Sequence, residues 1–315
     1  FWPGLCVTLK HSSRFASYCL IAKGKYPYEL DIPFPFALVN NDAAADRLEL
    51  MPAYFWMHNL YALERNAWKA AARDKRVVKV QRIHTEYLAP DTAEEILRAM
   101  ELLELWTGEA AAKAGLDAAS GSPSPEELRA LGRDLLSDGE NRMGALEVRG
   151  RNVERGRRPT LILKPRRAYR AYRRMLRYYA ARTILSYIEG WDGAFSFAAL
   201  ADDLGAPEAP DAASGEFGRV AEWVNLGGQI APAFRVDELR RRIGGGEVAS
   251  WDAVHGAYDE MAAAYPRDEA RHAWALLRLL LGAVPDAAAL AAELDGAAET
   301  ARWVAEQVYR TRAKD

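Results

Sequence analysis

Apolar residues recur every six residues at the start of the chain. Across FWPGLCVTLKHSSRFASYCLIAKG (residues 1–24), Leu9, Phe15 and Ile21 are separated by small and polar residues. A six-residue period fits neither a helix nor a simple strand. It is typical of a left-handed parallel β-helix, in which each coil has three short sides and each side places one apolar side chain on the axis. The pattern therefore predicts the terminal coils and cap of a left-handed β-helix over residues 1–50.

The chain enters this period in phase and without a methionine. We therefore expect it to be the C-terminal part of a longer protein, with further coils before Phe1. After Gly24, three prolines and alternating apolar residues in KYPYELDIPFPFALVNND predict extended chain that caps the open end of the β-helix. Hexapeptide β-helices often trimerise, so a homotrimer with sites between subunits is expected.

Beyond residue 50 the apolar spacing changes to three and four residues, which predicts helices. Trp56, Leu60 and Leu63 follow this spacing in a packing helix over residues 53–73. Stretches rich in Gly, Ala, Ser and Pro are predicted linkers, at residues 115–125 and 205–218. Besides residues 1–50, the sequence thus predicts three segments: 51–90 with the packing helix and a connector, 91–204 with helices that include a basic one, and 219–315 with a C-terminal helical bundle. The helices expected in the bundle cover residues 236–243, 251–264, 267–281 and 286–312.

Local signals indicate where individual helices begin. Asp91 with Glu94, and Ser124 with Glu127, have the three-residue spacing of a capping box. Pro165 is expected to begin the basic helix, because proline is favoured in the first turn.

The composition is that of a globular protein. With 50% hydrophobic and 27% charged residues, the chain has enough apolar material for two cores. A net charge of -2 indicates no bulk attraction to nucleic acid or to anionic membranes. Cys6 and Cys19 are the only cysteines and are interpreted as small buried residues, so a disulfide or zinc site is not expected and a cytoplasmic location fits best. No membrane-spanning helix or metal site is predicted, and the sequence leaves the cofactor open.

The chain also resembles a bacterial family known as domain of unknown function forty-nine fifty-four. The residues that carry the resemblance are the run from Phe1 to Asp42, then DRLELMPAYFWMHNLYALERNAWK and EYLAPDT, and later ILKPRRAYRAYRRML and EWVNLGGQ. The resemblance implies a long left-handed β-helix before Phe1, of the kind found in hexapeptide-repeat acyltransferases and sugar nucleotidyltransferases. It implies no reaction and no catalytic residues.

His11 is the candidate catalytic residue. Hexapeptide acyltransferases commonly use a histidine on a β-helix coil as general base towards a substrate hydroxyl or amine. In KHSSR, His11 lies two residues after Leu9, and Arg14 nearby would attract an anionic ligand. The alternative is a histidine that faces solvent in a turn and has no role in catalysis.

The most unusual feature of the charge distribution is a run of basic residues in a chain that is nearly neutral as a whole. Between Arg149 and Arg182 the sequence has thirteen Lys or Arg residues and a single acid, Glu154. On a helix that begins at Pro165, the arginines fall within about 100° of one another and form a stripe, opposite an apolar face. With the preceding lysine, the predicted anion- or substrate-binding residues are Lys164, Arg166, Arg170, Arg173, Arg174 and Arg177. Alternatively, the stripe is solvated or paired with acidic residues of another helix.

Two functions from different classes remain open at the level of sequence. The first is a transferase, of acyl or nucleotidyl groups, with a sugar phosphate, a nucleotide-sugar or acyl-coenzyme A as ligand. The second is a non-catalytic scaffold that presents its surfaces to a partner. The WVNLGGQ segment (residues 223–229) is interpreted as a tight turn whose glycines have positive φ, with Trp223 as its anchor.

Overall fold

The chain is mainly α-helical and falls into two units. A computed structural model describes residues 1–116, 123–138, 142–144, 146–205 and 215–312. Unit 1 comprises Phe1–Leu63, Glu95–Arg174 and Arg310–Asp315, and unit 2 comprises Glu64–Glu94 and Met175–Tyr309. The predicted division at residues 50, 90 and 204 stays a prediction, and the greater part of both predicted linkers lies outside the described residues.

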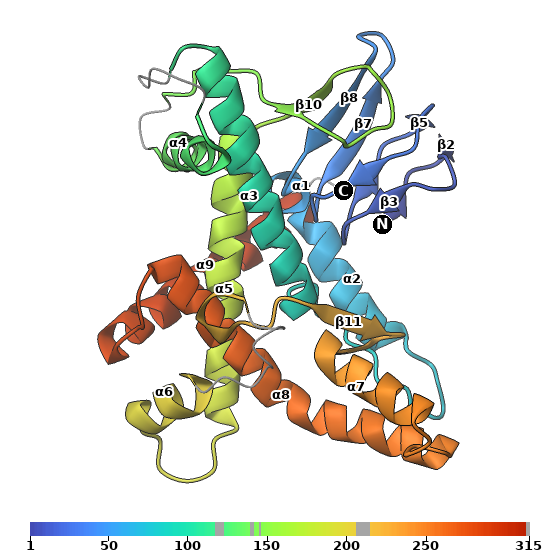
Figure 1. Cartoon of the computed structure of the whole chain (residues 1–315), viewed down its shortest axis with the longest axis vertical. Coiled ribbons are helices and arrows are strands. Elements are labelled where there is room, and N and C mark those ends of the chain that lie inside the picture. Colours follow the sequence, from blue (N-terminus) through green and yellow to red (C-terminus); the bar gives the residue numbers. More distant parts are fainter. Residues whose placement is uncertain (117–122, 139–141, 145, 206–214, 313–315) are drawn as a thin grey trace. The chain divides into compact units, whose positions relative to one another are not determined.

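Unit 1 is built on short strands. A six-stranded sheet has the order β1-β4-β7-β8-β10-β9, and two further pairs are β2-β5 and β3-β6. Figure 1 shows β7 and β8 side by side, with β10 next to them. The β7–β8 and β9–β10 pairs are antiparallel and the other pairs are parallel. The strands are β1 (Trp2–Pro3), β2 (Val7–Thr8), β3 (Arg14–Phe15), β4 (Leu20–Ile21), β5 (Gly24–Lys25), β6 (Asp31–Ile32), β7 (Leu38–Asp42), β8 (Arg47–Met51), β9 (Arg149–Gly150) and β10 (Thr160–Ile162).

The predicted left-handed β-helix of hexapeptide repeats is wrong. The first strands are two residues long and form short parallel pairs, but the main sheet then continues through an antiparallel hairpin and on to β10 and β9. Of the three residues that set the six-residue period, only Ile21 is buried, whereas Leu9 and Phe15 are half-buried. A solenoid axis requires an enclosed side chain at every repeat, so a short run of the period does not make one. Among the described residues there is no solenoid. The expected structural similarity to trimeric hexapeptide acyltransferases depended on that solenoid and is therefore withdrawn.

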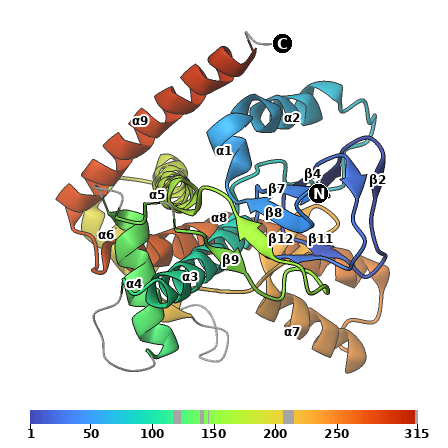
Figure 2. The ribbon, with the colours of Figure 1, turned by 90° about the horizontal axis from the view of Figure 1, so that it is seen from above.

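The helices of unit 1 pack closely at two glycines. A Cβ on Gly132 would lie 1.8 Å from the Glu104 carbonyl oxygen, and one on Gly108 would lie 1.9 Å from that of Leu128. Both contacts join α3 to α4, which lie side by side in Figures 1 and 2. The capping box predicted at Ser124 is confirmed. The helices are α1 (Tyr54–His58) and α4 (Pro125–Ser137), together with α2 (Leu60–Arg73), α3 (Pro90–Lys113) and α5 (Pro165–Glu189), which contribute residues to both units.

Unit 2 contains most of the remaining helices and one hairpin. The WVNLGGQ turn is confirmed: it joins β11 to β12, and Gly227 and Gly228 have φ of 74° and 125°. The two helices predicted around Pro266 are a single helix, because buried residues on both sides of the proline keep it packed. The elements are α6 (Phe197–Gly205), the 3-10 helix η2 (Glu216–Gly218), β11 (Trp223–Leu226), β12 (Gln229–Pro232), α7 (Ala233–Gly244), α8 (Trp251–Leu281) and α9 (Ala287–Arg312), the last of which contributes residues to both units.

Several predictions of local structure can be compared with the observed elements. The basic helix begins at Pro165 as expected. Its predicted apolar face is confirmed, since every one of its residues is fully buried: Ala168, Tyr172, Met175, Leu176 and Tyr179. The helix expected near Asp91 is present as α3. Two expectations are wrong: Asp91 lies in the first turn of α3 rather than at its N-cap, and Cys6 is exposed, whereas Cys19 is buried.

Candidate functional site

Two arginines of the predicted stripe hold the end of a neighbouring helix. Arg166 and Arg170 donate hydrogen bonds to the carbonyl oxygen of Asp138, and Arg170 also donates one to that of Ser137. The last carbonyl groups of a helix have no partner within that helix, and they carry the negative end of its dipole. Both arginines therefore cap α4, which is a structural role.

The other predicted anion-binding residues are not gathered into one site. Lys164 Nζ lies 3.1 Å from His58 Nε2, and burial together with the charge of Lys164 lowers the pKa of His58. Arg173 and Arg174 are exposed on α5 in unit 1. Arg177 belongs to unit 2, where it forms an ion pair with Glu293. The residues of the predicted stripe thus belong to two units and make separate contacts there.

His11 and Arg14 are both exposed in unit 1. His11 lies in the turn between β2 and β3, and Arg14 lies on β3. Neither residue lines the pocket described next. The catalytic role of His11 stays a prediction.

The first part of the basic run does surround a cavity. A pocket of about 750 Å³ lies in unit 1, a volume within the range of small-molecule sites. One wall is the C-terminal half of α3, and the other is β9 with the residues that lead into β10. We call it the basic pocket. Its charged lining residues are Lys113, Arg149, Arg151, Arg157 and Arg158, with Glu109 and Glu147.

Helical spacing and one glycine shape the walls of the basic pocket. Trp106, Glu109, Ala110 and Lys113 follow the spacing that places residues on one face of α3. On β9, a Cβ at Gly150 would lie 3.1 Å from Cζ3 of Trp106. Because glycine has no Cβ, the indole ring can lie against the strand.

A buried ion pair fixes the wall that leads into β10. Arg158 donates hydrogen bonds of 2.6 Å to both carboxylate oxygens of Glu154, and a third of 2.6 Å to Asn41 Oδ1. The hydrogen bonds to Glu154 raise the pKa of Arg158. The backbone of this segment is also tied to an earlier part of unit 1, since the Asp31 N–H donates to the Val153 carbonyl oxygen over 2.8 Å. The segment is therefore positioned before any ligand binds.

Cations outnumber acids around the basic pocket. Glu147 pairs with Arg149 over 2.6 Å, and Glu109 pairs with Arg151. Lys113 and Arg157 line the pocket and are exposed, and neither has a carboxylate partner among the described residues. Two positive charges are thus left for a ligand, and the arrangement favours an anion.

Part of the basic pocket could be predicted from the sequence. The basic run already included Arg149, Arg151, Arg157 and Arg158, but the site was predicted on the helix that follows them. Lys113 was missed because it lies far away in the sequence. Its only signal is the spacing that places it on the same face of α3 as Trp106.

Comparison with known proteins finds a similar sequence of unknown function. The chain is 38% identical over all of its 315 residues to an uncharacterized protein of Treponema pallidum (strain Nichols), and it spans 40% of the length of that protein. No family model and no solved structure matches the chain. Among the described residues, no helix is both long enough and apolar enough to cross a membrane.

Proposed function

We propose that unit 1 binds a phosphorylated small molecule, such as a sugar phosphate or a nucleotide-sugar, in the basic pocket. The observation that carries this proposal is the pair of uncompensated cations, Lys113 and Arg157, beside a cavity of about 750 Å³. We further propose transfer of an acyl or nucleotidyl group as the reaction, because acyl-coenzyme A and nucleotide-sugars are phosphorylated donors, and acyl-coenzyme A is therefore a further ligand to test. We also propose that the protein is cytoplasmic and that it is a member of the family known as domain of unknown function forty-nine fifty-four.

The charges around the pocket favour phosphate despite one opposing effect. The pocket adjoins the C-terminal end of α3, where the helix dipole disfavours an anion by roughly 0.3–1 kcal/mol. A hydrogen bond between a charged group and phosphate contributes about 1.5–3 kcal/mol, and an arginine can form two. Lys113 lies in the last turn of α3 and also compensates the dipole directly. The cations therefore outweigh the dipole.

A thermal-shift screen of the full chain tests the proposal. The probes are UDP-glucose, glucose 6-phosphate and acetyl-coenzyme A, each compared with glucose. A ligand that binds the native state raises the Tm by mass action, so we expect a rise with at least one phosphorylated probe and none with glucose. The rise should be lost in Arg157→Ala.

Arg155→Ala is the matched control for Arg157→Ala. Arg155 is a neighbour in the same basic run, but its side chain is 75% exposed, pairs with Glu29 and does not line the pocket. The Tm rise should therefore persist in Arg155→Ala. An equal rise in wild type and Arg157→Ala, or no rise with any phosphorylated probe, would contradict the proposed function.

A scaffold is the second candidate, and one observation favours it. The connector after α2 carries exposed apolar side chains, with Val77 99% and Val80 83% exposed. Exposed apolar clusters mark protein contact sites in many proteins. The ligand screen separates the two functions, because a scaffold predicts no response to any of the phosphorylated probes.

A further inference from the structure

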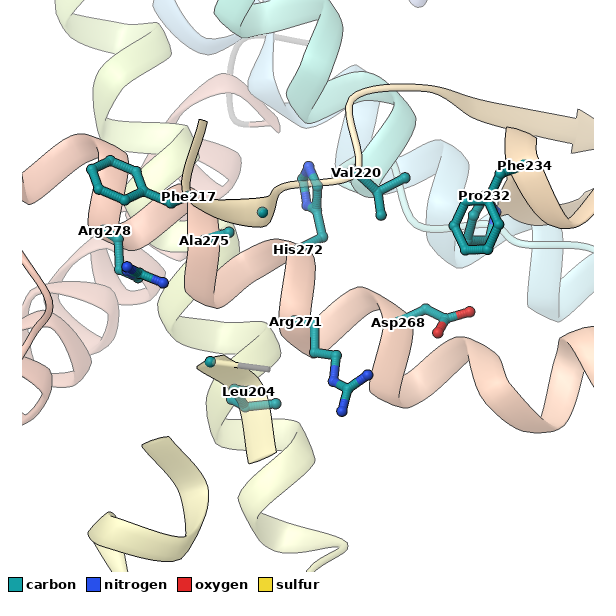
Figure 3. Close-up of a pocket in the computed structure, with 12 residues that line it drawn as sticks. Leu204, Phe217, Val220, Pro232, Phe234, Asp268, Arg271, His272, Ala275 and Arg278 are labelled. Atoms are coloured by element: carbon teal, nitrogen blue, oxygen red, sulfur yellow. The ribbon is translucent and has the colours of Figure 1, made fainter. Parts of the chain in front are cut away.

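A second, smaller cavity lies within unit 2. It has a volume of about 250 Å³, and Figure 3 shows the side chains that line it. Asp268, Arg271, His272, Ala275 and Arg278 all come from α8 at spacings of three and four residues, so one face of that helix forms a wall. Several other lining residues are apolar: Leu204, Phe217, Val220, Pro232 and Phe234. We call this cavity the α8 pocket.

The acidic groups around the α8 pocket already have partners. Asp268 accepts two hydrogen bonds from Arg235, of 2.8 and 3.0 Å. Asp203 accepts hydrogen bonds from Arg267 and, through its backbone carbonyl, from Arg271 over 3.1 Å. These acids are therefore neutralised before a ligand binds.

The imidazole of His272 is fixed rather than free. Its Nε2 lies 2.8 Å from Glu94 Oε1, and its Nδ1 lies 3.2 Å from the hydroxyl of Tyr179. Arg219 pairs with the same carboxylate of Glu94, and that carboxylate is buried. Both ring nitrogens are occupied, so His272 forms part of the wall and leaves its donors and acceptors unavailable to a ligand.

Arg278 is the uncompensated cation of this pocket. It has no carboxylate partner among the described residues, and its Nε is buried without a hydrogen-bond partner there. Its guanidinium group lies 4.8 Å from the centre of the Phe217 ring. Stacking on an aromatic ring fixes the plane of a guanidinium group and leaves its edge for a planar anion.

We infer that the α8 pocket binds a small carboxylate that carries an apolar substituent. The carboxylate pairs with Arg278, and the substituent lies against the apolar wall that includes Phe217 and Phe234. A cavity of about 250 Å³ holds roughly eight water molecules, a volume that suits a ligand of about ten heavy atoms better than a nucleotide. The site is separate from the basic pocket, which belongs to unit 1.

Isothermal titration of the full chain tests this inference, with phenylacetate as the probe. We expect saturable binding of phenylacetate with a Kd of about 1 mM or tighter, and none of the neutral analogue phenylacetamide. Arg278→Gln should weaken binding by about tenfold or more, because it removes the charge. Arg278→Lys keeps the charge but loses the planar fork and the stacking on Phe217, and should weaken binding by severalfold.

Arg302→Gln is the matched control, because Arg302 is exposed in α9 of unit 2 and does not line the pocket. It should bind phenylacetate within about twofold of wild type. The inference is overturned by absence of binding to wild type, by equal binding of phenylacetamide, or by tighter binding of inorganic phosphate than of phenylacetate. If Arg278→Gln does not fold, as judged by circular dichroism, Arg278→Lys decides, and wild-type affinity in that variant would contradict the role of Arg278.

Discussion

At the scale of the residue, Arg158 and Glu154 show how a charge run can hide a structural ion pair. Their side chains are 5% and 1% exposed. The sequence displayed Glu154 as the single acid in a basic run, but it did not show which cation that acid would neutralise. Within the part of the chain that the structure describes, Lys113 and Arg157 at the basic pocket have no carboxylate partner. Burial, which a sequence does not display, thus separates a structural arginine from one that is available to a ligand.

We predict that Glu154→Gln lowers the free energy of unfolding by about 3 kcal/mol, because the buried Arg158 loses both hydrogen bonds to its buried carboxylate and keeps the exposed carboxylate of Asp46, 3.9 Å away. Chemical denaturation monitored by circular dichroism measures the change. Glu147→Gln is the control: Glu147 is 50% exposed in its pair with Arg149, so its loss should change stability by less than about 1 kcal/mol. Equal effects of the two substitutions would refute the assignment of Arg158 as a buried anchor.

Glu269 gives a second prediction at this scale. Burial raises its pKa to about 7, although the positive charge of Arg182 opposes the shift. A carboxyl whose pKa is raised on folding binds its proton more tightly in the native state, so stability falls as the pH rises from the unfolded value of about 4.3 towards 7.

Replacement of Glu269 by glutamine removes that titration. We expect Glu269→Gln to gain stability relative to wild type between about pH 5 and pH 7, by up to roughly 3 kcal/mol. Denaturation of both proteins at a series of pH values measures the difference. A difference that does not change across this range would show that Glu269 titrates normally.

At the scale of the element, the contact between α3 and α4 depends on glycine. We predict that Gly132→Ala destabilises unit 1 by about 3 kcal/mol, because its Cβ would lie 1.8 Å from the backbone oxygen of Glu104. Gly296→Ala in α9 is the control, since no atom lies within 4 Å of a Cβ there. Alanine favours helix at such a position, and a gain of about 0.5–1 kcal/mol is expected. Thermal unfolding measures both, and a neutral Gly132→Ala would contradict the close approach of the two helices.

Local sequence patterns predicted structure correctly where a feature depends only on residues within one helix or one turn. The buried face of α5 follows from the spacing of Tyr172, Met175 and Tyr179, and the capping box at Ser124 follows from two side chains three residues apart. The prediction around Asp91 was wrong because Glu94 is used elsewhere: its carboxylate accepts from Arg219 and contacts His272. Such tertiary contacts override a local signal and cannot be seen in it.

At the scale of the whole molecule, a net charge of -2 conceals a local positive site. Opposite charges pair across elements that lie far apart in the sequence, as Glu109 does with Arg151. The prediction of a β-helix was wrong for a related reason. A six-residue period in one segment cannot show whether neighbouring segments continue a solenoid or, as here, form a hairpin and helices.

The charge of the basic pocket leads to a prediction about salt. If phosphate pairs with Lys113 and Arg157, the affinity for UDP-glucose should fall as ionic strength rises, because salt screens exposed charges over about 10 Å at 0.1 M. Titrations at about 50 and 500 mM salt measure this, with Arg157→Ala for comparison. Arg157→Ala should show the weaker dependence, and an affinity that is independent of salt in wild type would argue against ionic recognition.

The most direct test of the account is isothermal titration of UDP-glucose into wild type, Lys113→Ala, Arg157→Ala and the double variant, with Arg155→Ala as control. If the basic pocket binds phosphate through its two uncompensated cations, each single substitution should weaken binding by about tenfold and the double substitution by about a hundredfold. Arg155→Ala should bind as wild type does. Undiminished affinity in the double variant, or no binding to wild type, would contradict the central claim.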